Sequence, residues 1–183
     1  MTREEALKIL FEYTKTESLR KHAYSVEAAM RAYAEKYGED SELWGAIGLI
    51  HDFDYEKYPD EHPMKGGEIL AEMGVSEEIR KAILGHADFS GVPRDSLVAK
   101  TLFAVDELCG FIVAVTLVRP NKSVGEVSVK SVKKKMKDKR FAAKVNRDEI
   151  RQGAEELGVE FEDHVIFVVQ ALRGVAEEIG LNP

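Results

Sequence analysis

The chain has 183 residues, a formal net charge of −7, 44% hydrophobic residues and 32% charged residues, which is typical of a globular protein of one domain. The single cysteine, Cys109, excludes a disulfide framework and a zinc site built from several cysteines. The acidic balance argues against a protein that binds nucleic acid over its whole surface. The N-terminal sequence MTREEALKIL lacks the apolar core of a signal peptide, so the cytoplasm is the expected compartment.

The helical spacing of apolar residues dominates the first half of the chain. Thr2 and Glu5 form a capping-box pattern before the first apolar stripe, and Pro63 suits the first turn of a later helix. Loops are expected over 53–61 and 88–93. Helices are predicted over five segments: 3–14, 18–37, 40–51, 63–73 and 76–87.

The second half contains the longest apolar segment, a predicted helix over 94–118. Within it, Lys100, Asp106 and Glu107 argue against a membrane span, because a charge at the bilayer centre costs ~2.5–3.5 kcal/mol. We interpret this helix as central to a protein core. Pro120 ends this helix. Apolar and polar residues alternate only weakly over 123–132, so no strand is predicted. Further helices are predicted over 138–145, 147–157 and 161–179, which gives an all-α fold of eight to ten helices in a single domain spanning 1–183.

Basic residues gather after the long helix. Between Asn121 and Arg151 there are eleven Lys or Arg and four Asp or Glu residues. The run KKKMKDKR at 133–140 has two interpretations: a solvated helix face or loop, or a local field that draws an anionic substrate toward a nearby cleft. The sequence leaves both open.

Four of the five histidines lie at positions that need an explanation: His22, His51, His62 and His86. Asp106 interrupts the apolar run TLFAVDELCGFIVAV, where an unpaired carboxylate costs several kcal/mol and a divalent cation is an economical partner. Each of these residues, taken alone, could have a purely structural role. For His164, which lies outside this set, a structural role is what we expect. Together, imidazoles and carboxylates without a thiolate suit Fe, Mn, Zn, Co or Ni.

The order of His22, the doublet His51-Asp52 and Asp106 resembles the HD-domain superfamily of metal-dependent phosphohydrolases. The segment HPMKGGEIL at 62–70 is similar to the HP-x-x-G-x-x-IL helix of the HDIG-type subgroup, which binds two metals. AILGHAD at 82–88 resembles the His-bearing helix that follows in that subgroup. The resemblance covers about 18–118 and implies a helical HD-domain fold, with 119–183 as a C-terminal helical extension.

The resemblance also implies a set of metal ligands. The first divalent ion would be held by His22, His51, Asp52 and Asp106, and Asp52 would bridge to a second ion held by His62 and His86. One or two ions of Fe, Mn, Co, Ni or Zn are therefore expected. The implied activity is hydrolysis of a nucleotide or another small phosphate ester by a metal-activated hydroxide, which two ions ~3.5–4 Å apart can assist.

The sequence departs from the family pattern after the doublet. Many relatives have a lysine or a glutamate three residues after the Asp, where this chain has Tyr55. Candidate catalytic residues are therefore Asp52, Asp54 and Lys57, and Glu56 and Lys65 are further candidates for an acid or phosphate contact. The Gly-Tyr-Pro segment of cyclic-dinucleotide phosphodiesterases is missing, and GVP at 91–93 stands near its place, so that specificity is disfavoured.

Two other functions stay open at this stage. Some proteins of the HD fold with the same ligands are diiron oxygenases, and others are non-catalytic regulatory modules that bind a nucleotide. The expected partner is a small phosphorylated molecule, with a nucleotide as the first candidate. Neither a membrane nor a nucleic acid is an expected partner, and an oligomer is left open.

Overall fold

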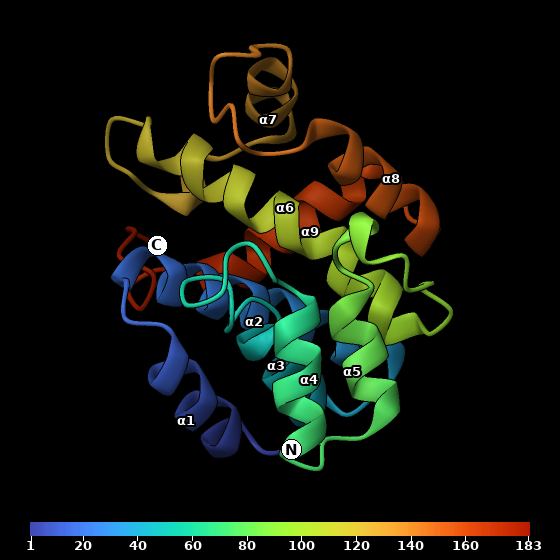
Figure 1. The fold of residues 1–183 in the computed structure, drawn as a ribbon. Helices are drawn as coiled ribbons and strands as arrows, with labels where there is room; N and C mark the ends of the chain where they lie inside the picture. The colour runs from blue at the N-terminus through green and yellow to red at the C-terminus, as the bar shows by residue number, and fades with distance from the viewer.

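The computed structural model describes residues 1–183 and contains nine α-helices and no β-sheet (Figure 1). The predicted all-α fold of eight to ten helices is therefore confirmed. No helix is both long enough and apolar enough to cross a membrane. The helices are α1 (Arg3–Tyr13), α2 (Glu17–Tyr37), α3 (Ser41–Ile50), α4 (Met64–Glu72), α5 (Glu77–Leu84), α6 (Leu97–Leu117), α7 (Val129–Met136), α8 (Arg147–Leu157) and α9 (Phe161–Arg173).

Side-chain caps fix where several helices begin. The Thr2 hydroxyl accepts a hydrogen bond from the Glu5 amide, and the Glu5 carboxylate accepts one from the Thr2 amide, which completes the predicted capping box of α1. The Asp40 carboxylate accepts two amide hydrogen bonds at the start of α3. Gly38, with φ 72°, ends α2 in the left-handed conformation that glycine adopts readily. The predicted boundaries in the first half of the chain are thus correct to within a few residues.

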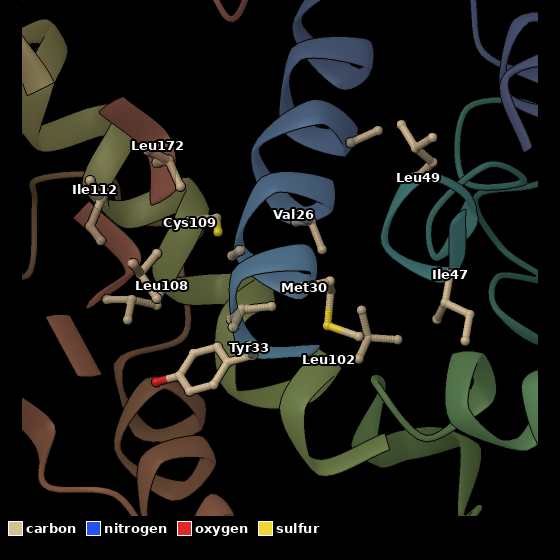
Figure 2. Packing of buried hydrophobic residues seen from close by; sticks show 14 of the residues in the cluster. Val26, Met30, Tyr33, Ile47, Leu49, Leu102, Leu108, Cys109, Ile112 and Leu172 are labelled. Atoms are coloured by element: carbon tan, nitrogen blue, oxygen red, sulfur yellow. The ribbon is translucent and has the colours of Figure 1, made fainter. Parts of the chain in front are cut away.

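The core is organised around α2, which lies between α3 and α6 (Figure 2). Val26 and Met30 of α2 are fully buried among apolar side chains of both neighbours. The long helix α6 has buried residues on nearly every face, as the sequence predicts. Because α2 and α6 also carry His22 and Asp106, their packing fixes the separation of those two side chains.

The structure differs from the predictions between residues 121 and 183. The helix predicted over 138–145 is wrong: these residues form turns, and Ala142 has a φ of 42°. The Asp138 carboxylate accepts from the amides of Arg140 and Phe141, and the Arg147 guanidinium donates to the carbonyl oxygens of Ala142 and Val145. Local carbonyl groups are thereby paired outside a helical ladder.

Helix α7 was not predicted. It begins with a capping box between Ser128 and Ser131, but only Val132 and Met136 are buried, so its apolar period is too short to recognise among the lysines. The predicted helix 161–179 ends earlier, at Arg173, and turns follow it to residue 180.

Substitution of Gly153 tests the close crossing of α8 over α6. A Cβ at this position would lie 2.6 Å from Ala104 Cα, a backbone atom that cannot move aside cheaply. We expect Gly153→Ala to lower the free energy of unfolding by about 1–3 kcal/mol in urea denaturation. The matched control is Gly110→Ala in α6, where a Cβ meets nothing closer than 4.0 Å. That variant should gain about 0.5–1 kcal/mol. Equal or greater stability of Gly153→Ala would contradict the crossing.

A buried histidine outside the His/Asp cluster gives a pH test. The Tyr33 hydroxyl lies 2.6 Å from His164 Nδ1, and His164 Nε2–H donates to the Ala104 carbonyl at 2.8 Å. Burial lowers the pKa of His164 to about 4, from an unfolded value near 6.5. The folded protein favours the neutral form of His164. The contribution of this neutral side chain to the free energy of unfolding is therefore complete above pH 6.5 and is lost as the pH falls toward 4.

We expect the wild type to lose about 3 kcal/mol more unfolding free energy between pH 7 and pH 4 than His164→Gln does. Urea denaturation of both proteins across this range measures the difference, in which the titrations shared by the two proteins cancel. Parallel pH profiles would show that His164 is not held neutral.

Candidate metal centre

Six side chains from five parts of the chain meet at one point. His22 comes from α2 and Asp106 from α6, while His51 and Asp52 directly follow α3. His62 precedes α4 and His86 follows α5. The apolar faces of these helices set the positions of the backbone. Five of the six side chains line one cleft, and His51 is buried behind them with its Nε2 directed at Asp52 and Asp106. The structure therefore brings together all six residues that the resemblance implies as ligands.

The first group of these side chains surrounds Asp106. Its Oδ1 lies 2.9 Å from His22 Nε2 and 3.3 Å from His51 Nε2. His51 Nε2 is also 3.5 Å from Asp52 Oδ2. One ligand atom from each of His22, His51 and Asp52 lies within 4.8 Å of the others, which is compatible with a single ion.

The second group surrounds the other oxygen of Asp52. His62 Nε2 lies 3.2 Å and His86 Nε2 3.1 Å from Asp52 Oδ1. The ligand atoms of these three residues also lie within 4.8 Å of one another. Asp52 thus presents Oδ2 to one histidine group and Oδ1 to the other, which is the arrangement of a carboxylate placed between two cation positions.

The hydrogen bonds of the histidines fit a metal site. Nδ1 of His51 lies 2.7 Å from the Gly48 carbonyl, and Nδ1 of His86 faces the Ile83 carbonyl. A carbonyl can only accept, so Nδ1 carries a proton, and in the neutral imidazole the lone pair on Nε2 faces the carboxylates. Nε2 of His51 is buried without a hydrogen-bond partner. A buried nitrogen lone pair directed at two carboxylates is a ligand geometry, and the residues present therefore fit a divalent cation.

Charge compensation at the cluster is reflected in its pKa values. Burial alone would lower the pKa of His62, but hydrogen bonds with Asp52 and Asp54 raise it to about 9. Burial alone would raise the pKa of Asp52, but the field of His51 and hydrogen bonds from His62 and His86 hold it well below its usual range. The carboxylates thus stay charged and need cationic partners, a role that protons on the imidazoles or metal ions can fill.

Asp54 lies behind His62 and does not line the cleft. It is 1% exposed, and its Oδ1 accepts from His62 Nδ1 at 2.7 Å while its Oδ2 accepts from the Gly66 amide at 2.7 Å. A Cβ at Gly66 would lie 2.8 Å from Asp54 Cγ, so the glycine makes room for this carboxylate. Asp54 therefore orients His62, and its contact with any ion runs through that imidazole.

The other charged candidates of this segment point elsewhere. The Lys57 ammonium lies 4.8 Å from the ring centroid of Tyr13 and is not part of the cleft lining, so its position gives no support to a catalytic role. Lys65 pairs with Glu68 at 2.9 Å. Glu56 accepts hydrogen bonds from the Lys15 and Thr16 amides just before α2.

The cleft above the six side chains has a volume of about 440 Å³. Sequence reasoning proposed no site role for several of its lining residues, which come from loops or from the C-terminal third: Tyr55, Asp88, Phe89, Lys144 and Glu149. Lys144 is the one lysine or arginine in the lining. The lysines of α7 lie outside it, and Lys133 pairs with Glu162, so most of the basic segment is a solvated surface.

The comparisons with known proteins agree with this geometry. The family model described as HD domain matches residues 19–110, which contain all six clustered side chains. No curated protein and no solved structure matches the chain. The family match covers half of the chain, and its first and last cluster residues, His22 and Asp106, lie within it. The chain therefore belongs to the HD-domain superfamily of metal-dependent phosphohydrolases.

Proposed function

We propose that the protein hydrolyses small phosphate esters with two divalent metal ions bound in the cleft. The observation that carries this proposal is the position of Asp52, whose two oxygens face two separate groups of histidines. A structural ion pair would need only one partner for such a carboxylate. A carboxylate directed at two sets of Nε2 lone pairs suits two adjacent cations.

The two positions differ in their protein ligands. Four residues would hold the first ion: His22, His51, Asp52 and Asp106. Three would hold the second: Asp52, His62 and His86. The second position thus leaves more room for water or substrate, as catalytic metal sites require. The donor set favours Fe, Mn, Co, Ni or Zn over Mg or Ca, because it is rich in imidazole.

The charge of the cleft supports a metal-dependent reaction. Its lining contains five carboxylate side chains and one lysine: Asp52, Asp88, Asp106, Glu107, Glu149 and Lys144. An excess of carboxylates repels a phosphate anion, and bound divalent cations would offset that negative charge. When bound, the ions would neutralise the phosphoryl group and lower the pKa of water toward ~7.

The chain's own groups would position the reactants. The Nε2 atoms of His22, His51 and His86 point inward from three elements, and their Nδ1 hydrogen bonds or helix packing restrict ring rotation. Phosphoryl transfer depends chiefly on such positioning and on charge stabilisation. Lys144 lines the cleft and would contact a substrate oxygen. A nucleotide or another small phosphate ester is the expected substrate.

Metal analysis combined with kinetics tests the proposal. After reconstitution with manganese, iron or cobalt, we expect about two equivalents per chain and hydrolysis of phosphate esters. Asp52→Ala should lose both ions and at least about 10²-fold in kcat/KM. His62→Ala or His86→Ala should retain about one equivalent. Asp60→Ala, an exposed acidic residue nearby, serves as the control.

Three outcomes would contradict the proposal. Activity that survives Asp52→Ala would remove the site from the reaction. Oxygen uptake with iron and a reductant, without hydrolysis of phosphate esters, would show an oxygenase. Nucleotide binding without turnover of any phosphate ester would show a regulatory module.

The role of Asp54 gives a finer test of the second ion. Asp54→Asn keeps the shape of the side chain but removes the charge behind His62. We expect this variant to bind the second ion about 10–100-fold more weakly, the usual effect of losing the hydrogen-bond partner of a ligating imidazole. Titration with cobalt, followed by visible absorption, separates the two binding steps. Asp60→Asn is the matched control, and equal affinities in all three proteins would show that Asp54 has no positioning role.

A further inference from the structure

A second cavity of about 240 Å³ adjoins the metal cleft. It lies between α2, the C-terminal half of α6 and the segment 179–181. The C-terminus reaches this place beside the first turns of α2 (Figure 1), where Lys21 Nζ lies against Gly180. His22 and Gly110 line both the cleft and this cavity. The cleft and the second cavity therefore adjoin each other at these two residues.

The walls of this cavity are mainly apolar, with Val113, Leu117, Ile179 and Leu181 among them. Its polar side chains are largely engaged elsewhere. The Ser25 hydroxyl donates to the Lys21 carbonyl at 2.9 Å, and Lys21 Nζ pairs with Glu17 at 2.6 Å. No Phe, Tyr or Trp side chain is present in the lining, and its one aromatic ring is the His22 imidazole. The cavity thus offers an apolar group a place out of water, but gives a nucleobase no stacking surface beyond the His22 ring and few hydrogen-bond partners.

Gly110 lies at the boundary of the two spaces, and no neighbouring atom is close enough to exclude a Cβ at this position. It lies inside α6, where glycine lowers helix stability relative to alanine. A Cβ at Gly110 would meet only the His22 ring, at 4.0 Å. The other glycines within helices each have an atom of a neighbouring segment within 3.0 Å of such a Cβ: Gly45, Gly48, Gly66, Gly67 and Gly153. The missing side chain at Gly110 instead leaves free space beside the His22 ring, which would be the passage between the cleft and the second cavity.

We propose that the second cavity binds the apolar alcohol portion of the substrate, an aryl group or an alkyl group larger than ethyl, while its phosphate lies at the His/Asp cluster. This inference rests on the proposed function and narrows its substrate class. The volume of the second cavity agrees with this assignment, since an apolar cavity of about 150 Å³ suffices for benzene. The preferred substrates are then aryl or alkyl phosphates, ahead of nucleotides.

The test compares 1-naphthyl phosphate with ethyl phosphate. Val113 lines the second cavity but not the metal cleft, so Val113→Phe fills the cavity from the far side of Gly110. We expect the ratio of kcat/KM for naphthyl phosphate to that for ethyl phosphate to fall by at least about tenfold. Metal content should match the wild type. Val118→Phe adds the same ring at the exposed end of α6 and should leave the ratio unchanged.

A binding measurement separates this inference from the proposed function. Fluorescence titration with 1-naphthol needs no turnover, and Val113→Phe should weaken binding by a similar factor. Gly110→Ala narrows the passage, keeps the fold and should lower the naphthyl to ethyl ratio as well. If 1-naphthol binds wild type and not Val113→Phe, but no phosphate ester is hydrolysed, the cavity assignment stands and the proposed function fails.

Two results would overturn the cavity assignment. One is hydrolysis of phosphate esters with the same substrate ratio in the wild type, Val113→Phe and Gly110→Ala, which would leave the proposed function intact. The other is a preference for a nucleoside monophosphate over 1-naphthyl phosphate of more than about tenfold.

Discussion

The constraint on which this structure depends is the charge compensation of two carboxylates at the base of a cleft in the helical core. Asp106 sits on α6 among buried residues, and Asp52 lies between two sets of imidazoles. Carboxylates in such surroundings are stable only with cations at hydrogen-bond or coordination distance. The helices must therefore hold four histidines at fixed positions, and the close packing of α2 against α3 and α6 supplies that rigidity.

Much of the fold and of the cluster could be predicted from the sequence, because both depend on strong local signals. Apolar periodicity and caps located the helices of the first half. Histidines at the ends of apolar runs, together with Asp106 within one, indicated a metal site. The signals fail where structure is decided by contacts distant in sequence. The turns at 138–145 depend on Arg147, and α7 buries only Val132 and Met136.

The same reasoning explains which functional roles the sequence left undecided. Asp54 and Lys57 are three residues apart in one loop, and their residue types alone make both candidates. The structure separates them, since Asp54 contacts His62 while Lys57 lies over the Tyr13 ring. The second cavity is still harder to foresee, because it exists only where residues 179–181 meet α2 and α6.

The His/Asp cluster and the outer walls of the two cavities thus come from different segments of the chain. All six clustered side chains lie between residues 22 and 106, within the segment that the family shares. Residues after 119 supply Lys144 and Glu149 to the cleft, and Ile179 and Leu181 to the second cavity. Ions bound by α2, α6 and the ends of three further elements would also link these elements and stabilise the folded state by mass action. Under the proposed function, changes in the C-terminal third would alter which ester enters without altering how the ions are held.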